Sequence, residues 1–377
     1  MRAYVFPDAR LAKLAGRFAW LEIDTEKPHN AAFLERYPVE VWPTLLVIDA
    51  ASETVALRWA GTATAAQVEK LVLDGERALG AGRVTAAEEA LARADRLSGE
   101  RRHAESAVAY AEAVRKGGRG WPGAERAAES RVQALSLAGD PVACADAARE
   151  VLPALGHGPA AARASAQGLS CALEIEDEAG REAALSALEP RARQEVGSKG
   201  ILADDRSWLY DVLSQTRAAR GDESGARAAS QRWMAFLEDE ARRAPTPAAR
   251  SAFDGPRVSA AIRLGDPARA LPAVLASERE LPQDYVPPTH LAVLYLELDR
   301  PAEALTASRR ALSLARGPRR VRVHVLEAQA LLALERPGEA RAALEAALGD
   351  GEALPEAARP EGWLGRAGEM LETIPTK

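Results

Sequence analysis

The sequence predicts an α+β domain followed by an all-α region, in which helices pair to form repeats. Before residue 80, short apolar runs alternate with segments of helical spacing. Beyond about Gly80 the composition shifts to Ala, Leu, Glu and Arg, and strand-like alternation disappears. Regular Gly-Asp or Gly-Glu breaks then divide the chain into pieces of helical length. We therefore expect an α/β domain over 1–80, divergent helical repeats over 81–250, and regular repeats over 251–377.

The first forty residues predict a helix, a strand and a second helix. Apolar residues recur at helical spacing over Val5–Phe18, which predicts an amphipathic helix. The apolar run Ala19–Ile23 ends at polar residues and predicts a short buried strand. Asn30 is a suitable N-cap for the next helix, and Pro38 ends it by disfavouring helical geometry at the preceding residue.

The next forty residues predict a β-hairpin and a third helix. Strands over Thr44–Ile48 and Thr54–Trp59 flank a polar turn at Asp49–Ser52. Thr64 is predicted to cap a helix whose apolar stripe reaches Leu79. The expected order of elements is therefore α, β, α, β, β, α.

This order resembles the thioredoxin fold without its first strand. The resemblance covers Met1 to about Leu79 and rests on Phe6 and Asp8, Phe18, Leu21-Glu22-Ile23-Asp24, Trp42-Pro43-Thr44, the strand Leu57–Gly61 and the helix after it. One thioredoxin-like branch carries Cys-x-x-Cys-x-x-Met at the start of the first helix, and Met1 stands where that methionine would be. The resemblance implies an N-terminally truncated thioredoxin-like domain whose redox dithiol would lie upstream of Met1.

The same resemblance implies a substrate-docking site at Trp42, Pro43 and Thr44, with a cis Trp42–Pro43 bond beside an extended peptide. The alternatives are an ordinary trans proline at a strand start and simple packing of Trp42. In that fold the missing strand lies between the strands expected at 19–23 and 44–48. Because each buried unpaired amide costs about 1–3 kcal/mol, we expect the strand to be encoded upstream, or the gap to be covered by helices and a partner.

The C-terminal part resembles tetratricopeptide repeats, whose period is roughly 34 residues. The matching positions in three successive copies are Pro267 and Ala270, Pro301 and Ala304, and Pro337 and Ala340. Small residues there let two antiparallel helices approach closely. Divergent earlier copies are expected to turn at Gly99–Arg102, Gly139–Pro141, Glu176–Glu178 and Gly221–Glu223. Pro355–Glu372 is predicted to form a capping helix over the last apolar face.

The repeat resemblance implies a peptide groove lined by the first helix of each repeat. The groove residues would be Val293, Leu296, Gln329 and Leu332, although packing against neighbouring helices is the alternative role for them. Thr289 and Val293 occupy positions where chaperone-binding repeats carry a Lys/Asn/Arg carboxylate clamp. A chaperone-tail ligand is therefore not expected.

Composition excludes several other functions. The chain of 377 residues is 47% hydrophobic and has a formal net charge of −6. That charge argues against a general nucleic-acid surface, and no uninterrupted apolar span predicts a membrane helix. Five histidines without metal spacing predict neither a metal site nor a cofactor. Cys144 and Cys171 are expected to be reduced packing residues, because they lie far apart within helical repeats.

Two functions follow from these patterns. The first is a thioredoxin-family thiol-disulfide oxidoreductase whose dithiol is missing from this chain and whose solenoid binds protein clients. The alternative is a non-catalytic tetratricopeptide adaptor or scaffold for protein–protein interaction. The chain as given is expected to show no disulfide reductase activity. Without a visible signal peptide it is expected in the cytoplasm, or in the periplasm if an upstream signal peptide is missing.

Overall fold

The computed structural model describes residues 1, 5–80, 84–118 and 120–374. By internal contacts the chain forms two compact units. Unit 1 comprises Met1–Ala19 and Pro38–Trp233, and unit 2 comprises Trp20–Tyr37 and Met234–Lys377. The short segment Trp20–Tyr37 therefore packs with the C-terminal helices.

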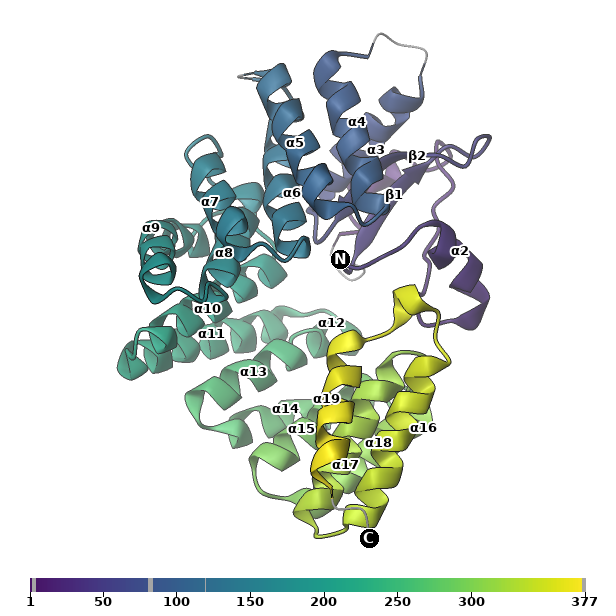
Figure 1. Ribbon diagram of the computed structural model, residues 1–377, viewed down its shortest axis with the longest axis vertical. Coiled ribbons are helices and arrows are strands. Elements are labelled where there is room, and N and C mark those ends of the chain that lie inside the picture. Colours follow the sequence, from purple (N-terminus) through teal and green to yellow (C-terminus); the bar gives the residue numbers. More distant parts are fainter. Residues whose placement is uncertain (2–4, 81–83, 119, 375–377) are drawn as a thin grey trace. The chain divides into compact units, whose positions relative to one another are not determined.

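Both units consist mainly of helices (Figure 1). Unit 1 contains α1 (Ala9–Ala12), β1 (Thr44–Ile48), β2 (Val55–Ala60), α3 (Ala65–Leu79), α4 (Ala86–Gly99), α5 (His103–Gly117), α6 (Ala124–Leu137), α7 (Pro141–Val151), α8 (Pro159–Leu173), α9 (Glu178–Val196) and α10 (Ala203–Ala219). The helix α11 (Glu223–Arg243) begins in unit 1 and ends in unit 2. Unit 2 contains the 3-10 helix η1 (Pro28–Asn30), α2 (Ala31–Arg36), α12 (Pro247–Ser251), α13 (Asp254–Leu264), η2 (Pro267–Ala270), α14 (Leu271–Glu280), α15 (Val286–Glu297), α16 (Pro301–Leu314), α17 (Arg319–Ala333), α18 (Pro337–Glu352), η3 (Glu356–Ala358) and α19 (Glu361–Thr373).

The predicted hairpin is confirmed. β1 and β2 pair antiparallel, with Thr44 opposite Ala60 and an irregularity between Val47 and Ile48. The turn is closed by Asp49, whose carboxylate accepts hydrogen bonds from the Ala51 N–H and the Ser52 hydroxyl. The predicted cap of α3 is also present, because the Thr64 hydroxyl accepts from the Gln67 N–H in a capping box.

The rest of the thioredoxin-like sheet is not confirmed. Within the described residues the only sheet has two strands, and the strand predicted over Ala19–Ile23 is irregular backbone. Its side chains are not buried, since Trp20 is 45% and Leu21 78% exposed. A strand requires a hydrogen-bonded neighbour, and the described residues place no strand beside this run. An apolar run alone was therefore insufficient to specify a strand.

The first predicted helix is also shorter than expected. Only α1 is helical within Val5–Phe18, and Gly16 adopts a positive φ of 82° that interrupts the pattern. The apolar spacing still marks the core correctly, because Leu11 and Leu14 are buried against Leu57, Trp59 and other residues of the hairpin and α3.

Side chains from the repeat helices cover the outer edge of β2. The Arg58 N–H donates to Asp95 Oδ2 at 3.1 Å, and the Arg58 carbonyl accepts from Arg126 Nη1 at 3.1 Å. Asp95 also accepts from the Tyr110 hydroxyl at 2.8 Å, and burial raises the pKa of that phenol well above its usual range. These buried polar groups of α4, α5 and α6 occupy the place that a further strand would take.

Six turns of the described chain share one hydrogen-bonding pattern. A residue with positive φ ends the first helix of each pair, and the next N–H donates to the carbonyl five residues earlier. A small buried residue follows in the second helix or, for Ala270, in the 3-10 helix η2 that precedes it. The positive-φ and small residues are Arg101 and Ser106, Gly139 and Cys144, Gly221 and Ala226, Gly265 and Ala270, Asp299 and Ala304, and Glu335 and Ala340. Three of the four turns predicted in the divergent region, Gly99–Arg102, Gly139–Pro141 and Gly221–Glu223, therefore have this pattern, and the helical repeats extend into unit 1. The fourth, Glu176–Glu178, lies between α8 and α9 without it.

Replacing Ala304 by leucine is expected to destabilise unit 2 by about 1–3 kcal/mol, because added methylenes overpack a close helix contact. Ala304 is fully buried in the core that α16 shares with α17 and α18. Urea denaturation followed by circular dichroism measures the loss. Ala302→Leu is the matched control, since Ala302 is exposed on the same helix, and equal effects of the two substitutions would contradict the packing argument.

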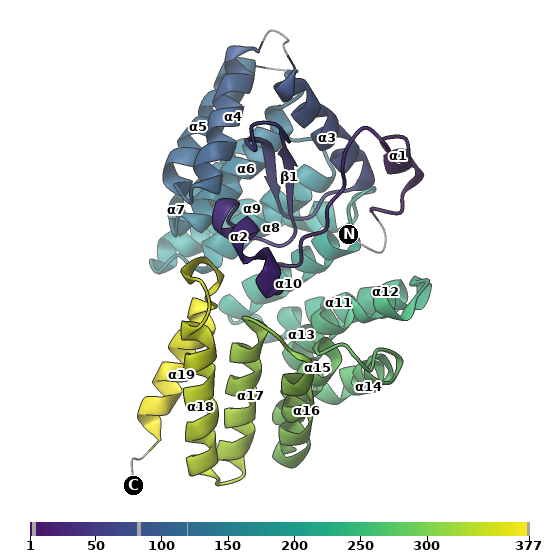
Figure 2. The same ribbon diagram turned by 90° about the vertical axis from the view of Figure 1, so that its right-hand side faces the viewer.

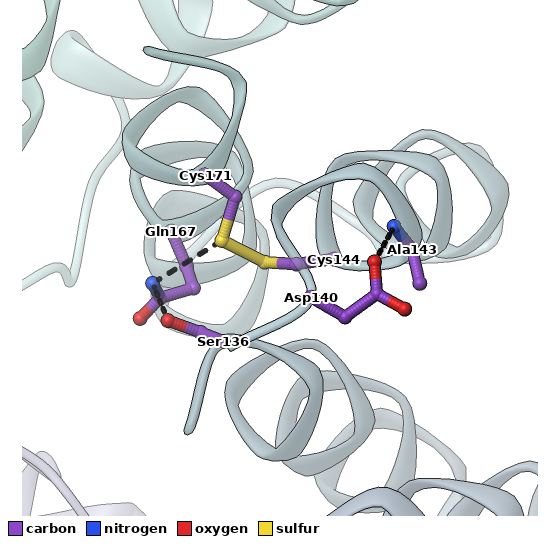
Figure 3. The surroundings of a disulfide bond; sticks show 6 residues. All are labelled: Ser136, Asp140, Ala143, Cys144, Gln167 and Cys171. Carbon is purple, nitrogen blue, oxygen red and sulfur yellow. Dashed lines mark hydrogen bonds between the residues drawn. A yellow bond between two sulfur atoms is a disulfide. The ribbon is translucent and has the colours of Figure 1, made fainter. Parts of the chain in front are cut away.

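The expectation that both cysteines are reduced is wrong. Cys144 of α7 and Cys171 of α8 form a disulfide with a Cα–Cα distance of 6.0 Å (Figure 3). Their separation in sequence was misleading, because the α7–α8 pair folds back and brings both residues into one buried layer. Gln167 lies beside the bridge and donates to Ser136 Oγ at 2.9 Å. The packing role of Cys144 was predicted correctly, since the residue is fully buried at the small-residue site of its repeat.

The predicted terminal helix is present as α19. Its Ala367 is fully buried, and Trp363, Leu364 and Leu371 pack against the core of α17 and α18. Figure 2 shows α16, α17, α18 and α19 side by side, in the order in which their contacts connect them.

Candidate peptide-binding surface

The four predicted groove residues lie on neighbouring helices of unit 2. Val293 and Leu296 are on α15, Gln329 and Leu332 are on α17, and the two helices are in contact. Within each helix the two residues are three positions apart and so share a face. All four are partly buried.

These residues divide into two kinds by their packing. Leu296 and Leu332 contact the hydrophobic core formed with α16, α18 and α19. Val293 and Gln329 are not among the residues of that core and retain accessible surface. Leu296 and Leu332 therefore have a structural role whether or not a ligand is bound, and Val293 and Gln329 are the better positions for testing binding.

A cluster of arginines lies at the N-terminal end of α17, at one end of this surface. Arg319, Arg320 and Arg322 occupy the first turn, which contains no acidic residue. A helix N-terminus carries partial positive charge and disfavours cations. Arg320 is neutralised by Asp350 at 2.7 Å. No sequence pattern singled out this cluster, because its carboxylate partners lie far from it in the chain.

Glu26 approaches this cluster from the N-terminal segment of unit 2. Its carboxylate accepts from Arg319 Nε at 2.6 Å and from the Tyr285 hydroxyl at 3.4 Å. Burial, with the carboxylate adding a smaller effect, raises the pKa of Tyr285 to about 12. An added Cβ at Gly317 would lie 3.2 Å from the Glu26 carbonyl oxygen, so the backbone of the segment also lies close to the α16–α17 loop.

The turn that presents Glu26 is organised by its neighbours in sequence. Asp24 Oδ1 accepts from the Glu26 N–H at 3.0 Å, and the Asp24 carbonyl accepts from Asn30 Nδ2 at 2.8 Å. Asn30 therefore stabilises this turn, and its side chain does not cap α2 as predicted. Asp24 therefore stabilises the turn through both its side chain and its backbone carbonyl.

Arg322 differs from the other two arginines of the turn. Among the described residues it has no hydrogen-bond or carboxylate partner, and its buried Nε is unsatisfied. Desolvation, with the Arg319 charge adding to it, lowers the pKa of Arg322 from its usual value. Its guanidinium lies 5.4 Å from the ring centroid of Trp363, which also contacts Arg366 at 5.6 Å. The surface thus contains a partly buried cation without an anion.

His290 of α15 adds a neutral polar group. Its ring packs against Gly255 of α13, where an added Cβ would lie 3.3 Å away. Burial, together with the charge of Arg322, lowers the pKa of His290 to about 4. The imidazole is therefore uncharged at neutral pH and leaves the positive charge of this region to the arginines.

The predicted docking residues of the hairpin lie in unit 1. The Trp42–Pro43 bond is cis, as predicted. Trp42 is 58% exposed, and the Thr44 hydroxyl donates to the Val41 carbonyl at 2.6 Å. The loop before them is held by Glu40, which contacts His103 Nε2 at 2.9 Å and Arg101 Nε at 2.9 Å. Binding by these residues remains a prediction.

The part of the chain that the structure describes contains no group of three or more His, Cys, Asp or Glu side chains placed to hold a metal ion. None of the helices in these ranges combines the length and apolar character needed to cross a bilayer.

Comparison with protein families and with curated protein sequences gave no match. Comparison with solved structures gave several similarities, three of which follow. A tetratricopeptide repeat protein from Parabacteroides merdae is 11% identical with a TM-score of 0.47, and the match covers 75% of this chain and 98% of that one. The assembly chaperone of RpL4, Acl4, is 17% identical with a TM-score of 0.34 over 66% and 96% of the two chains. The TPR2AB domain of yeast Sti1, in a complex named for pHSP90, is 15% identical with a TM-score of 0.28 over 75% and 98%.

Proposed function

We propose that this chain is a non-catalytic, tetratricopeptide-like adaptor that binds an extended segment of a partner protein across α15 and α17. One observation carries the proposal: Val293 and Gln329 lie on adjacent first helices of two repeats, partly accessible and not among the residues of the core that α16, α17, α18 and α19 share. Neighbouring helices so arranged offer a continuous strip on which apolar and amide groups of a peptide can pack and hydrogen-bond.

The proposal is tested with defined ligands selected from a library of random peptides by the immobilised full-length chain. The selected peptides are titrated by fluorescence anisotropy. The double substitution Val293→Arg and Gln329→Arg is expected to weaken binding at least about tenfold, because two large cations would obstruct the strip and be partly desolvated. Thr306→Arg is the matched control, since Thr306 is exposed on the second helix α16. Selection of no binding peptide, or equal affinity of all three proteins, would contradict the proposal.

A second docking site at Trp42, Pro43 and Thr44 is supported by the exposure of Trp42 on an anchored loop. The same peptides can be titrated into Trp42→Ala to assign them to one surface or the other. Disulfide exchange is not part of the proposed function. The only two cysteines of the chain are joined to each other, and their side chains are 0% and 2% exposed, whereas exchange requires an accessible thiolate.

A further inference from the structure

The first turn of α17 carries a charge imbalance that the adaptor function alone does not explain. Three arginines stand at a helix end that favours anions, and only two have a carboxylate partner among the described residues. The third, Arg322, is partly buried and its Nε is unsatisfied. Burying a cation without an anion is costly, so this site would be stabilised by one further negative group.

We propose that Arg319, Arg322, Tyr285 and Trp363 form a recognition site for an acidic peptide segment of a partner protein, and that Glu26 of this chain occupies it as an internal competitor. These four residues are called the acidic-peptide site below. The proposal rests on the proposed function, because the site adjoins the α15–α17 strip, and it adds the chemical class of the partner.

The contacts of Glu26 indicate what kind of ligand fits. A carboxylate on a non-helical stretch of backbone is already accepted by Arg319 and the Tyr285 hydroxyl, with that backbone close to Gly317. The absence of a side chain at Gly317 lets the backbone at Glu26 pass close by, because an added Cβ would lie only 3.2 Å from the Glu26 carbonyl oxygen. A peptide with two or more neighbouring acidic residues could pair with Arg319 and Arg322 together, which Glu26 alone does not do.

The internal competitor is weakly held and can therefore be displaced. Its ion pair to Arg319 is partly exposed, with 48% of the arginine and 23% of the glutamate side chain accessible, so solvent and salt weaken the attraction. The segment around it also buries little apolar surface, because α2 contains no buried residue and Leu21 is 78% exposed. A ligand that neutralises both arginines would replace Glu26 without unfolding a core.

The test measures binding of a fluorescein-labelled oligoglutamate peptide to the full-length chain. Glu26→Gln is expected to tighten binding about fivefold, the change expected when a competing exposed ion pair is removed. Glu35→Gln is the matched control, because it makes the same charge change at an exposed position of the same segment, and it should bind like the wild type. Adding Arg322→Gln to Glu26→Gln should abolish the gain. Arg319→Gln provides the same check at a more exposed residue if Arg322→Gln folds poorly.

The outcomes separate this inference from the proposed function. Equal affinity of the wild type, Glu26→Gln and Glu35→Gln would overturn the role of Glu26. Retention of oligoglutamate binding by both arginine variants would overturn the acidic-peptide site. Either result leaves the proposed function standing if the library peptides still lose affinity with Val293→Arg and Gln329→Arg. If no selected peptide binds the chain at all, the proposed function fails separately.

Discussion

Arg163→Met is expected to destabilise unit 1 by about 3–5 kcal/mol, the usual cost of removing one partner from a buried ion pair. Arg163 is 6% exposed on α8 and donates to both carboxylate oxygens of Glu129 on α6. It also donates to Asp205 Oδ2 of α10 at 3.0 Å. Methionine would preserve much of the side-chain volume and leave two buried carboxylates without their cation. This loss is a large fraction of the 5–15 kcal/mol typical of a folded protein.

The loss is expected to depend on pH. Burial raises the pKa of both Glu129 and Asp205, and Arg163 opposes that rise. Without the arginine the two folded-state pKa values rise further, so the folded variant binds protons that the unfolded chain does not. Its stability relative to the wild type therefore increases as the pH falls through those raised pKa values. The difference in free energy of unfolding between the wild type and Arg163→Met should therefore be largest at neutral pH and smaller in mildly acidic buffer.

Urea denaturation of unit 1 at neutral and mildly acidic pH measures both effects. Arg149→Met is the control, because Arg149 forms an exposed ion pair with Asp146 on α7, and exposed pairs contribute about 0–1 kcal/mol. If Arg163→Met does not fold, the combination with Glu129→Gln and Asp205→Asn should recover folding by removing the unpaired charges. The proposed role of the Arg163 ion pairs would be contradicted if Arg163→Met lost no more stability than Arg149→Met. It would also be contradicted if the loss became larger in acid.

Loss of the Cys144–Cys171 disulfide is expected to destabilise unit 1 by about 3–4 kcal/mol. The bridge closes a loop with a sequence separation of 27, and the chain-entropy relation for a loop of that length gives this value. Because both sulfurs are buried, a reductant should act mainly when the surrounding helices open.

Thermal unfolding with and without reductant measures the effect. The double variant Cys144→Ala and Cys171→Ala is the control, and its unfolding temperature should be lower and insensitive to reductant. Maleimide labelling in denaturant without reductant tests the bond directly. Two modified cysteines in the wild-type chain would show that the disulfide is absent.

The sequence predicted the helical repeats well because their determinants are local. A residue that tolerates positive φ, followed by a small residue five positions later, specifies both the turn and the close helix contact. This pattern could be recognised at Gly265 and Ala270, and it is equally present at Gly139 and Cys144. The β-hairpin was predictable for the same reason, since its polar turn and alternating strands adjoin in sequence.

The parts that could not be predicted depend on contacts between distant residues. The run Ala19–Ile23 is apolar enough for a strand but has no neighbouring strand to pair with in the described chain. The contact between Glu26 and Arg319 joins residues that are 293 positions apart in the sequence. The disulfide depends on how α7 packs against α8. No local pattern of residue types distinguishes these partners from other pairs of the same chemistry.

The common geometry of the six turns has a consequence for protein engineering. All six turns have the same backbone hydrogen bonds. A segment that begins just after one positive-φ residue and ends at the next therefore has ends that can be joined to each other in the native turn geometry. Asp266–Asp299 is such a segment. A duplicated copy would join its neighbours through two native junctions, so the array can be lengthened by one helical pair without designing a new linker.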